Sequence, residues 1–408
     1  MNAHLANSRS FIITLGLLTA VAALTVDLSL PAIPAMAEAL DSTLSQGQQI
    51  VGIFLLGMAL GQIPAGLASD RFGRLPILFV GMCIFVVSAI VTAVATDVNI
   101  LLGARFVQGF GAAASIVVAR AVVRDIASGA DAAKIMSLLT MIFTAAPVIA
   151  PSFGAILVTQ WHWRAPFIVI AGCGALLLFA TRVYLVETHV PNAEQHPLRQ
   201  LKSSFGEFFS HRQSVFGLLV MVVPPAGYLS IIAVSSALAV DIYGFSLAQY
   251  ALIFACAGLS ILAGAATNRW LVTRFTIMQI LMADVVIILI ASVQLLIIAW
   301  LNDAPFWWLW TCVCMNMFTM AIFQSNATVL TLDPLPKIAG FASSIIGTSQ
   351  NLIGGFGALL GALIYDGSVR NATIILGVSG TLTAAIFFLR PLIITGPLVH
   401  HPDELARD

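Results

Sequence analysis

Charged residues are scarce in this chain. Lysine, arginine, aspartate and glutamate make up only 9% of its 408 residues, whereas hydrophobic residues make up 60%. Soluble domains carry about 25% charged residues, so this chain has too few to cover a water-soluble globule of its size. The mean hydropathy of +1.00 agrees. We therefore expect an all-α membrane protein, whose helices satisfy their own backbone hydrogen bonds within the bilayer.

Lysine is rarer still, with only Lys134, Lys202 and Lys337, and none of the three follows a glycine. A Walker phosphate-binding loop needs a Gly-Lys pair, so the chain has no ATP site of that type. Its net charge is zero and no basic face accumulates, which argues against nucleic-acid binding. Energy for any transport must come from a source other than ATP bound by this chain.

Cysteine and histidine do not suggest a metal site or a cofactor. The five cysteines lie in apolar runs, so we expect small buried thiols rather than disulfides or metal ligands. The histidines fall in termini and predicted loops, so a proton relay inside the membrane would have to use carboxylates. The cysteines are Cys83, Cys173, Cys256, Cys312 and Cys314.

Long apolar runs are abundant. A helix that crosses a bilayer needs about 20 residues, and the sequence predicts twelve such spans. The first carries Asp27 and is too long for a signal peptide. The predicted spans are 11–30, 49–68, 77–95, 100–123, 135–158, 165–186, 215–237, 247–266, 277–301, 306–330, 341–364 and 372–394.

Positive residues orient the spans, because they concentrate in cytoplasmic loops. With the N-terminus inside, 15 lysines and arginines fall on the cytoplasmic side, and only Arg164 and Arg370 fall outside. Arg105 falls within a span. We expect a multi-pass protein of a bacterial inner membrane with both termini in the cytoplasm.

A polar stretch divides the chain into two halves. It runs from Glu187 to Gln213, and we expect a plain solvated linker there. Gly66-x-x-x-Asp70-Arg71 ends the second span, and a similar Gly264-x-x-x-Asn268-Arg269 ends the eighth. This repeat predicts two related six-helix bundles, 1–186 and 214–408, joined by a linker at 187–213.

Several motifs together resemble the major facilitator superfamily over the whole chain. Gly66-x-x-x-Asp70-Arg71-x-Gly73-Arg74 resembles its signature loop, and Arg105-x-x-Gln108-Gly109 resembles an element of its proton-coupled members. Asp27-x-x-x-Pro31-x-x-Pro34 resembles the Bcr/CflA drug-resistance branch, as do Ser325-Asn326-Ala327 and Ala342-Ser343-Ser344. The resemblance implies drug:H+ antiport and two six-helix bundles related by a pseudo-two-fold axis.

The fifth span resembles the antiporter element of the superfamily through Pro147, Pro151 and Gly154. It departs from that element at Ala146 and Ala150, where many relatives carry glycine. Prolines bend helices, and here the bend would shape one mouth of the transport cavity. Packing of the helix without any gating role is the alternative.

Asp27 and Asp284 are the acids inside predicted spans. A charge there costs at least about 2.5–3.5 kcal/mol. Asp27 and Arg105 fall at similar depth, so we expect a direct or water-bridged contact, with Gln108 orienting the arginine. Asp27 would carry the coupled proton while Arg105 tunes it, although a helix-end role for Asp27 and a structural role for Arg105 remain open.

Asp284 lies about two turns into the ninth span, where a tie to a neighbouring helix is favoured over a second proton site. The Asp70 loop is expected to be a conformational latch, in which Asp70 meets a helix N-terminus and the arginines meet carboxylates of a neighbouring helix. The alternative is membrane anchoring. Its residues are Gly66, Asp70, Arg71, Gly73 and Arg74.

Polar residues inside apolar spans are candidates for the substrate cavity, although hydrogen bonds between helices explain them equally well. The candidates are Gln108, Tyr228, Asn316, Gln324, Asn326, Gln350 and Asn351. The predicted function is proton-coupled efflux of small amphiphilic compounds, without a cofactor, by a monomer. Export of one metabolite or siderophore, proton symport for uptake, a membrane enzyme and a channel are the alternatives.

Overall fold

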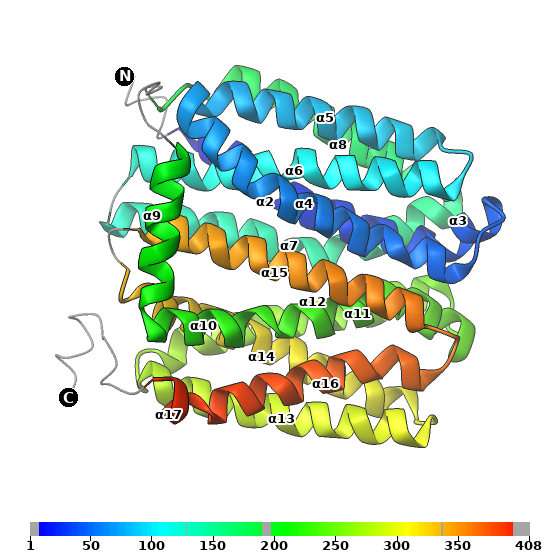
Figure 1. Cartoon of the computed structure of the whole chain (residues 1–408). Helices are drawn as coiled ribbons and strands as arrows, with labels where there is room; N and C mark the ends of the chain where they lie inside the picture. The colour runs from blue at the N-terminus through cyan, green and yellow to red at the C-terminus, as the bar shows by residue number, and fades with distance from the viewer. Residues whose placement is uncertain (1–7, 128, 190–196, 336–337, 395–408) are drawn as a thin grey trace. The chain divides into compact units, whose positions relative to one another are not determined.

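The computed structural model describes residues 8–127, 129–189, 197–335 and 338–394. Within these ranges, all regular secondary structure is helical (Figure 1). The elements are α2 (Arg9–Ser29), η1 (Leu30–Ala32), α3 (Ile33–Ala39), α4 (Leu44–Phe72), α5 (Arg74–Val94), α6 (Val98–Ile126), α7 (Gly129–Gln160), α8 (Ala165–Tyr184), α9 (Pro197–Ser210), α10 (Arg212–Val222), α11 (Pro224–Ala237), η2 (Leu238–Ile242), α12 (Leu247–Leu271), α13 (Ile277–Leu301), α14 (Phe306–Leu332), α15 (Ala339–Ile364), α16 (Val369–Phe388) and α17 (Arg390–Ile393).

Each of the twelve predicted spans corresponds to a helix or to a run of consecutive helices. Among the described residues, 11 of these are both long enough and apolar enough to cross a membrane. The remaining one, α15, has 26 residues, but its glycines and the adjacent Gln350 and Asn351 lower its hydropathy. The first span is longer than predicted, because the chain continues in helical turns past Pro31 to Ala39.

Local capping explains several of the helix starts. The hydroxyl of Thr43 accepts from the backbone N–H of Gln46 at 3.2 Å, while the Gln46 side chain accepts from the Thr43 N–H at 3.0 Å. Asp97 caps α6 and Ser368 caps α16 in a similar way. These side chains bind the N–H groups that a helix cannot satisfy in its first turn.

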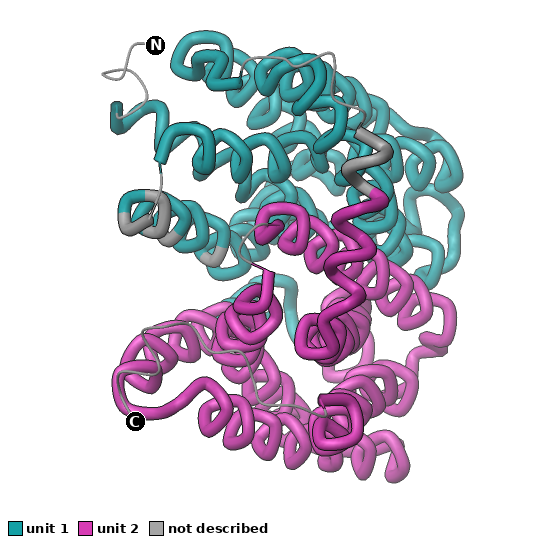
Figure 2. The backbone as a smooth tube through the Cα atoms, turned by 60° about the vertical axis from the view of Figure 1, so that its left-hand side comes forward, with its two compact units in different colours: residues 1–197, 245–255 teal, residues 198–244, 256–408 magenta. Residues whose placement is uncertain are grey.

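The chain divides into two compact units, shown in teal and magenta in Figure 2. Unit 1 comprises residues 1–197 and 245–255, and unit 2 comprises residues 198–244 and 256–408. The start of α12 is therefore grouped with unit 1, and the rest of α12 with unit 2.

In unit 1, α6 packs against α4 and α5, α8 packs against α5, and α2 packs against α7 and α8. The close approach of α4 and α6 depends on small residues. A Cβ atom on Gly57 would collide with the backbone of Phe106, and one on Gly109 with the backbone of Phe54. Small residues allow helix backbones to approach in this way within membranes.

In unit 2, α13 packs against α14 and α16, and α11 packs against α15 and α16. Here too a glycine sets the helix separation, because a Cβ atom on Gly357 of α15 would collide with the backbone of Ala226 in α11. The seventh predicted span is two helices, since Pro224 starts α11 directly after α10.

The predicted solvated linker is partly wrong. Residues 197–210 form α9, whose Phe208 is fully buried. Phe205 also packs edge-on against Phe341, with ring centroids 5.2 Å apart. Aromatic residues spaced three or four apart on a helix share one face, and burial of that face orders this part of the linker. Residues 190–196 of the predicted linker lie outside the described residues.

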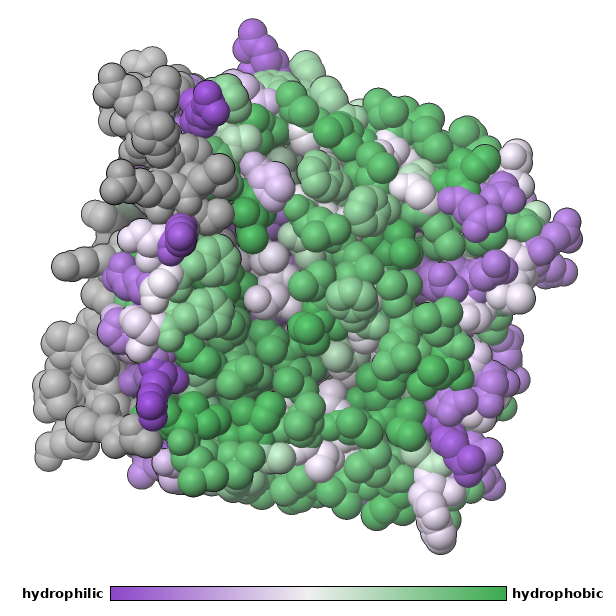
Figure 3. Space-filling view, viewed as in Figure 1, coloured by the Kyte–Doolittle hydropathy of each residue, from purple (hydrophilic) through white to green (hydrophobic). Residues whose placement is uncertain are grey.

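Apolar side chains cover most of the face shown in Figure 3, and hydrophilic residues gather at helix ends. This apolar surface explains why the prediction that the five cysteines are buried is wrong for four of them. Cys83, Cys173 and Cys256 are exposed, Cys314 is intermediate and only Cys312 is buried. An apolar run in a membrane protein has a face toward lipid, so apolar surroundings in sequence do not imply burial in protein.

Candidate functional site

Arg105 on α6 is a fully buried cation in unit 1. Its Nη1 donates to Oε1 of Gln108 at 3.0 Å, and its Nη2 donates to Oγ of Ser29 on α2 at 3.4 Å. Its guanidinium carbon lies 4.8 Å from the ring centroid of Phe54 and 5.9 Å from that of Phe167. Cation–π contacts of desolvated groups contribute about 2 kcal/mol, so neutral hydrogen bonds and ring faces hold this charge.

Asp27 is also buried, with 6% of its surface exposed. Asp27 makes no direct contact with Arg105, since no ion pair within 4 Å joins the two among the described residues; the water-bridged contact stays a prediction. Arg105 instead contacts Ser29, two residues further along α2. Residues at i and i+2 point to different sides of a helix, which explains why the arginine meets one and not the other.

Asp27 also lies deeper than the sequence suggested. The helical run that carries it continues to Ala39, so Asp27 is not at the end of its span. Gly154 of α7 lies directly against the backbone of Leu28, because a Cβ atom added to this glycine would collide with it. Helix α7 therefore packs against this part of α2. Asp27 is thus a buried carboxyl within the membrane-spanning part of unit 1.

The second feature of unit 1 is the α4–α5 junction, which we define as residues 66–75. Arg74 donates from Nε to Asp125 Oδ2 at 2.9 Å, from Nη2 to Asp125 Oδ1 at 3.3 Å, and from Nη1 to Ser69 Oγ at 2.9 Å. It also pairs with Asp70. A two-pronged arginine–carboxylate contact is geometrically specific as well as strong. Arg74 therefore connects α4, the start of α5 and the end of α6.

The segment after α8 completes this network. Glu187 accepts from the backbone N–H groups of Arg74 and Leu75, each at 2.9 Å. Thr188 donates to Asp125 at 3.0 Å, and Nε2 of His189 lies 2.9 Å from the carbonyl oxygen of Asp70. A carboxylate on free N–H groups at a helix N-terminus is favourable. Here the acid at the α5 N-terminus is Glu187, not Asp70 as predicted.

Gly73 is required at the junction for two reasons. Its φ is +100°, which side chains other than glycine rarely adopt, and an added Cβ would lie 2.8 Å from Glu187 Oε2. Gly66 is under no such constraint, because an added Cβ would meet only Val117 at an ordinary 3.5 Å. Arg71 does not join the carboxylates; its guanidinium lies 5.3 Å from the ring centroid of Phe72.

The predicted antiporter element lies within α7, which remains one helix across Pro147 and Pro151. Gly154 packs against the backbone of Leu28 on α2. Ala146 and Ala150, where many relatives carry glycine, are both buried. The element thus forms part of the α2–α7 interface.

In unit 2, four of the cavity candidates bind other protein groups. Asn326 donates to Oδ1 of Asn268 on α12 at 2.7 Å and to its own helix at Ile322. Gln350 donates to the carbonyl oxygen of Met221 at 3.3 Å. The Asn316 and Asn351 amides donate within their own helices. Tyr228 and Gln324 are half-buried on α11 and α14.

Asp284 is two turns into α13, as predicted, and 2% of its surface is exposed. Neither of its carboxylate oxygens has a hydrogen-bond partner in the structure. The favoured expectation, a tie to a neighbouring helix, is therefore wrong for this structure. The described residues also contain no group of three or more metal-binding side chains.

Sequence reasoning missed several residues of these sites. Asp125 had a readable signal, since it ends the fourth span at the same side as the Asp70 loop. Glu187 closes the sixth span at that side too, but the sequence assigned it to the linker. Phe54 and Phe167 carried no signal, because the chain contains 25 phenylalanines.

Comparison with known proteins identifies the class. The sequence profile of the Major Facilitator Superfamily matches residues 15–358. The chain is 30% identical over 356 residues to a bicyclomycin resistance protein homologue of Haemophilus influenzae, covering 87% of this chain and 88% of that protein. It is 27% identical over 359 residues to multidrug resistance protein D of Escherichia coli, covering 87% and 89%. The chain belongs to the Major Facilitator Superfamily, and the resemblance to its Bcr/CflA branch is confirmed.

Solved structures show the same fold. The TM-score is 0.76 with a D-xylose-proton symporter at 16% identity, covering 93% of this chain and 97% of that one. It is 0.72 with an inward-facing bacterial homologue of the human lysosomal transporter Spinster at 16% identity, covering 95% and 98%. The predicted all-α major facilitator fold is confirmed, and the protein is a multi-pass secondary transporter rather than an enzyme.

Proposed function

We propose that this protein exports small amphiphilic organic compounds, antibiotics among them, in exchange for protons. The observation that carries the proposal is the buried carboxyl of Asp27, which lies inside the membrane without a direct ion pair to Arg105. Intramembrane acids are costly and typically functional. The drug-resistance names of the relatives from Haemophilus influenzae and Escherichia coli supply the substrate class.

The proposed cycle is alternating access between the two six-helix bundles, 1–186 and 214–408, joined at 187–213. A proton from outside binds Asp27 and releases the substrate there. Loss of that proton to the cytoplasm restores the substrate-binding state. The proton gradient supplies the energy, so neither a cofactor nor ATP is required, and the chain acts as a monomer.

Arg105 takes the role of a fixed positive charge near the proton carrier. Ser29, Gln108 and two aromatic rings hold it, so its position does not depend on Asp27. An opposite charge favours the ionised form of a carboxyl only when it lies within about 4–6 Å, whereas burial favours the protonated form, so this role requires the two side chains to approach each other during the cycle. The balance between the two allows the proton to leave when access changes.

The α4–α5 junction is proposed as a conformational latch. Its Arg74 joins three helices, and Glu187 and His189 attach the segment after α8. Packed interfaces of this kind switch between distinct arrangements and do not deform continuously. Pro147, Pro151 and Gly154 would transmit movement through the α2–α7 interface.

The distribution of lysine and arginine supports a bacterial inner-membrane location with both termini in the cytoplasm. The candidate substrate-binding residues are Gln108 in unit 1 and, in unit 2, Tyr228, Asn316, Gln324, Asn326, Gln350 and Asn351. Few polar groups among many apolar ones suit amphiphilic compounds.

The test uses inside-out membrane vesicles with an acidic interior and a pH-sensitive dye. Candidate drugs are added to wild type, to Asp27→Asn and to Asp41→Asn, in which an exposed loop acid is changed as a control. We expect drug-induced proton loss in wild type and in Asp41→Asn, and none in Asp27→Asn.

Equal proton movement in all three proteins would contradict the role of Asp27. A folded wild type that gives no response to any drug would contradict broad drug antiport. That result would favour an exporter for one metabolite or a carrier that does not use protons.

A further inference from the structure

Asp284 of unit 2 is a buried acid that the proposed cycle does not use. It lies on the inward face of α13, whereas Met282, Val286 and Ile290 on the other face are exposed. The nearby inward residues Leu281, Val285 and Ile288 belong to the hydrophobic core of unit 2. Neither carboxylate oxygen of Asp284 has a hydrogen-bond partner among the residues that the structure describes.

The helices packed against α13 offer this carboxyl no countercharge. α14 contains no acidic or basic residue, and its ionisable groups are the thiols of Cys312 and Cys314. α16 contains Arg370 alone, and that arginine is in the first turn, where it donates to Ala299 near the other end of α13. The ionised form of Asp284 is therefore uncompensated by either neighbouring helix.

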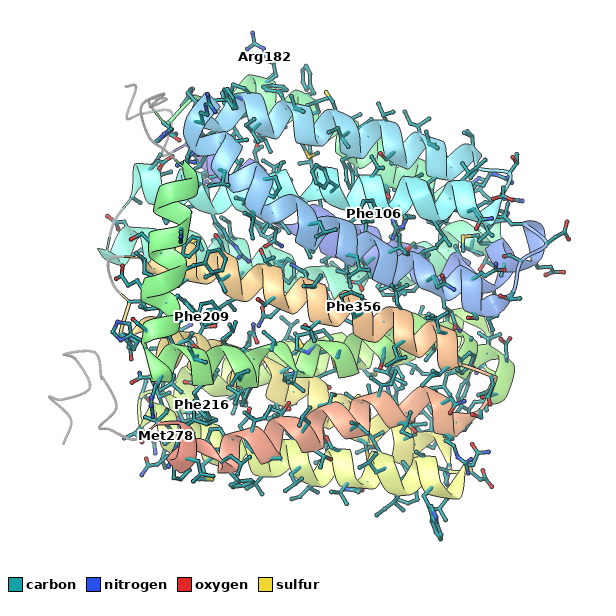
Figure 4. All side chains as sticks on the ribbon, viewed as in Figure 1. Phe106, Arg182, Phe209, Phe216, Met278 and Phe356 are labelled. Atoms are coloured by element: carbon teal, nitrogen blue, oxygen red, sulfur yellow. The ribbon has the colours of Figure 1, made fainter. Side chains whose placement is uncertain are left out.

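One cation lies beside the start of α13. Arg390 of α17 donates to the sulfur of Met278, which Figure 4 labels, and its guanidinium carbon lies 5.9 Å from the Phe387 ring centroid. A thioether is a weak acceptor, and Met278 precedes Asp284 on the same helix. This end of α13 therefore carries a polar group, and it is the end through which we expect water to enter.

We propose that Asp284 is a second proton-binding site, which takes up and releases a proton during the transport cycle. In the arrangement described here the carboxyl holds its proton, because an unpaired buried carboxylate is the less stable form. Movement that opens the start of α13 to water lets one oxygen lose that proton to water on that side, and the carboxyl takes up a proton from the opposite side when access changes, so each cycle carries one proton across the membrane. Charge and atoms balance with no other reactant.

A purely structural role does not account for this residue. An acid kept for packing alone would pair with a neighbouring helix or bind its own backbone, as Asn326 and Thr331 do on α14. Asp284 does neither. The coupling part of the inference rests on the proposed antiport, whereas proton binding by the carboxyl does not.

Infrared spectroscopy of the purified protein tests proton binding without a substrate. We expect the spectrum of wild type to contain a band from a protonated carboxyl free of hydrogen bonds, which disappears as the pH is raised. Asp284→Asn removes this band and Asp27→Asn keeps it. Ser292→Ala, which changes another buried, unpartnered side chain of α13, serves as the control and also keeps it.

If Asp284→Asn does not fold, labelling of wild type with a hydrophobic carbodiimide takes its place, because that reagent modifies protonated carboxyls in apolar surroundings. We expect modification of Asp284 that declines with rising pH. No modification at any pH, or a free-carboxyl band that is unchanged in Asp284→Asn, would overturn the assignment.

Coupling is measured in proteoliposomes as the substrate gradient that balances a known proton gradient. We expect Asp284→Asn to move one proton fewer per substrate than wild type, and Ser292→Ala to match wild type. An unchanged ratio in Asp284→Asn would overturn the coupling role. Loss of one proton in Asp284→Asn with normal coupling in Asp27→Asn would instead overturn the proposed role of Asp27 and support Asp284.

Discussion

The α4–α5 junction of unit 1 and the α12–α13 junction of unit 2, residues 264–279, begin with the same sequence pattern and are stabilised differently. In unit 1, Arg74 binds Asp125 and Asp70, and Glu187 caps α5 from a distant part of the chain. In unit 2, Asn268 accepts one neutral hydrogen bond from Asn326.

The start of the second helix differs in the same way. The hydroxyl of Thr276 accepts from the N–H of Gln279, whose side chain accepts in return, so α13 is capped by its own residues. Arg274 lies over the ring of Trp270, 4.9 Å from its centroid. One junction is thus a charged link between several elements, whereas the other has one neutral hydrogen bond from α14 to α12 and a helix cap made by its own residues. A repeated motif therefore does not imply a repeated mechanical role.

The largest expected effect comes from removing the charged link. Arg74→Leu leaves Asp70 and Asp125 without their cation, and we expect it to lower the free energy of unfolding by about 2–3 kcal/mol. Asn268→Ala removes one neutral hydrogen bond and should cost about 1 kcal/mol. Thermal unfolding of both variants in the same detergent measures the difference. Equal losses would contradict the comparison.

A smaller effect is expected at the glycines. Gly73→Ala should destabilise the protein by about 1–3 kcal/mol, because its backbone is left-handed and its Cβ meets Glu187. Gly66→Ala, within a helix and with only an ordinary contact to Val117 for its Cβ, should instead stabilise the protein by about 0.5–1 kcal/mol. The two melting temperatures should shift in opposite directions. An unchanged or raised melting temperature in Gly73→Ala would show that Gly73 is not under the constraint described.

A third comparison separates the two kinds of helix cap. Glu187→Gln and Thr276→Ala should each lower the free energy of unfolding by about 1 kcal/mol. The two losses therefore differ in how they depend on salt concentration and not in their size. Raising the salt concentration to about 1 M screens an exposed charge and should reduce the cost of Glu187→Gln alone. Hydrogen exchange provides a second measurement, because the amides of Arg74 and Leu75 should exchange faster only in Glu187→Gln.

Two of the buried ionisable side chains within spans, Arg105 and Asp284, show a parallel contrast. Arg105 in unit 1 is held by hydrogen bonds and aromatic faces, whereas Asp284 in unit 2 has no partner. We expect Arg105→Lys to destabilise the protein by about 2 kcal/mol, because an ammonium cannot reproduce the planar fork or the ring stacking. Asp284→Leu should stabilise it by about 1–3 kcal/mol while removing the proposed proton site. A loss of stability in Asp284→Leu would indicate a partner for the carboxyl.

Much of the fold could be predicted because two requirements constrain each span separately: the helix must match the bilayer thickness, and its backbone groups must be hydrogen-bonded within the lipid. The positions of Asp27, Arg105 and Asp284 within spans followed from the same local rule. Their partners did not follow, because they depend on helix rotation and neighbour choice. Arg105 and Asp27 fall at similar depth, yet a rotation of two residues along α2 brings Ser29 to the arginine instead.

The same distinction explains the polar and small residues. Asn326 was a cavity candidate from its sequence position, and its bond to Asn268 depends on the packing of α12 against α14. The five cysteines looked buried because their neighbours in sequence are apolar, but a helix in a membrane has a lipid side that hydropathy alone does not distinguish from its core side.

The sequence by itself determined that the chain is a bundle of membrane helices with isolated acids among them, because hydropathy, span length and residue type are local properties. Only the tertiary structure decided that Arg74 joins Asp125 and that Glu187 caps α5. It also decided that Asp284 has no partner. These outcomes depend on which helix faces lie against each other, and residues far apart in sequence meet only when the backbone hydrogen bonds and side-chain packing of the whole unit fix those faces.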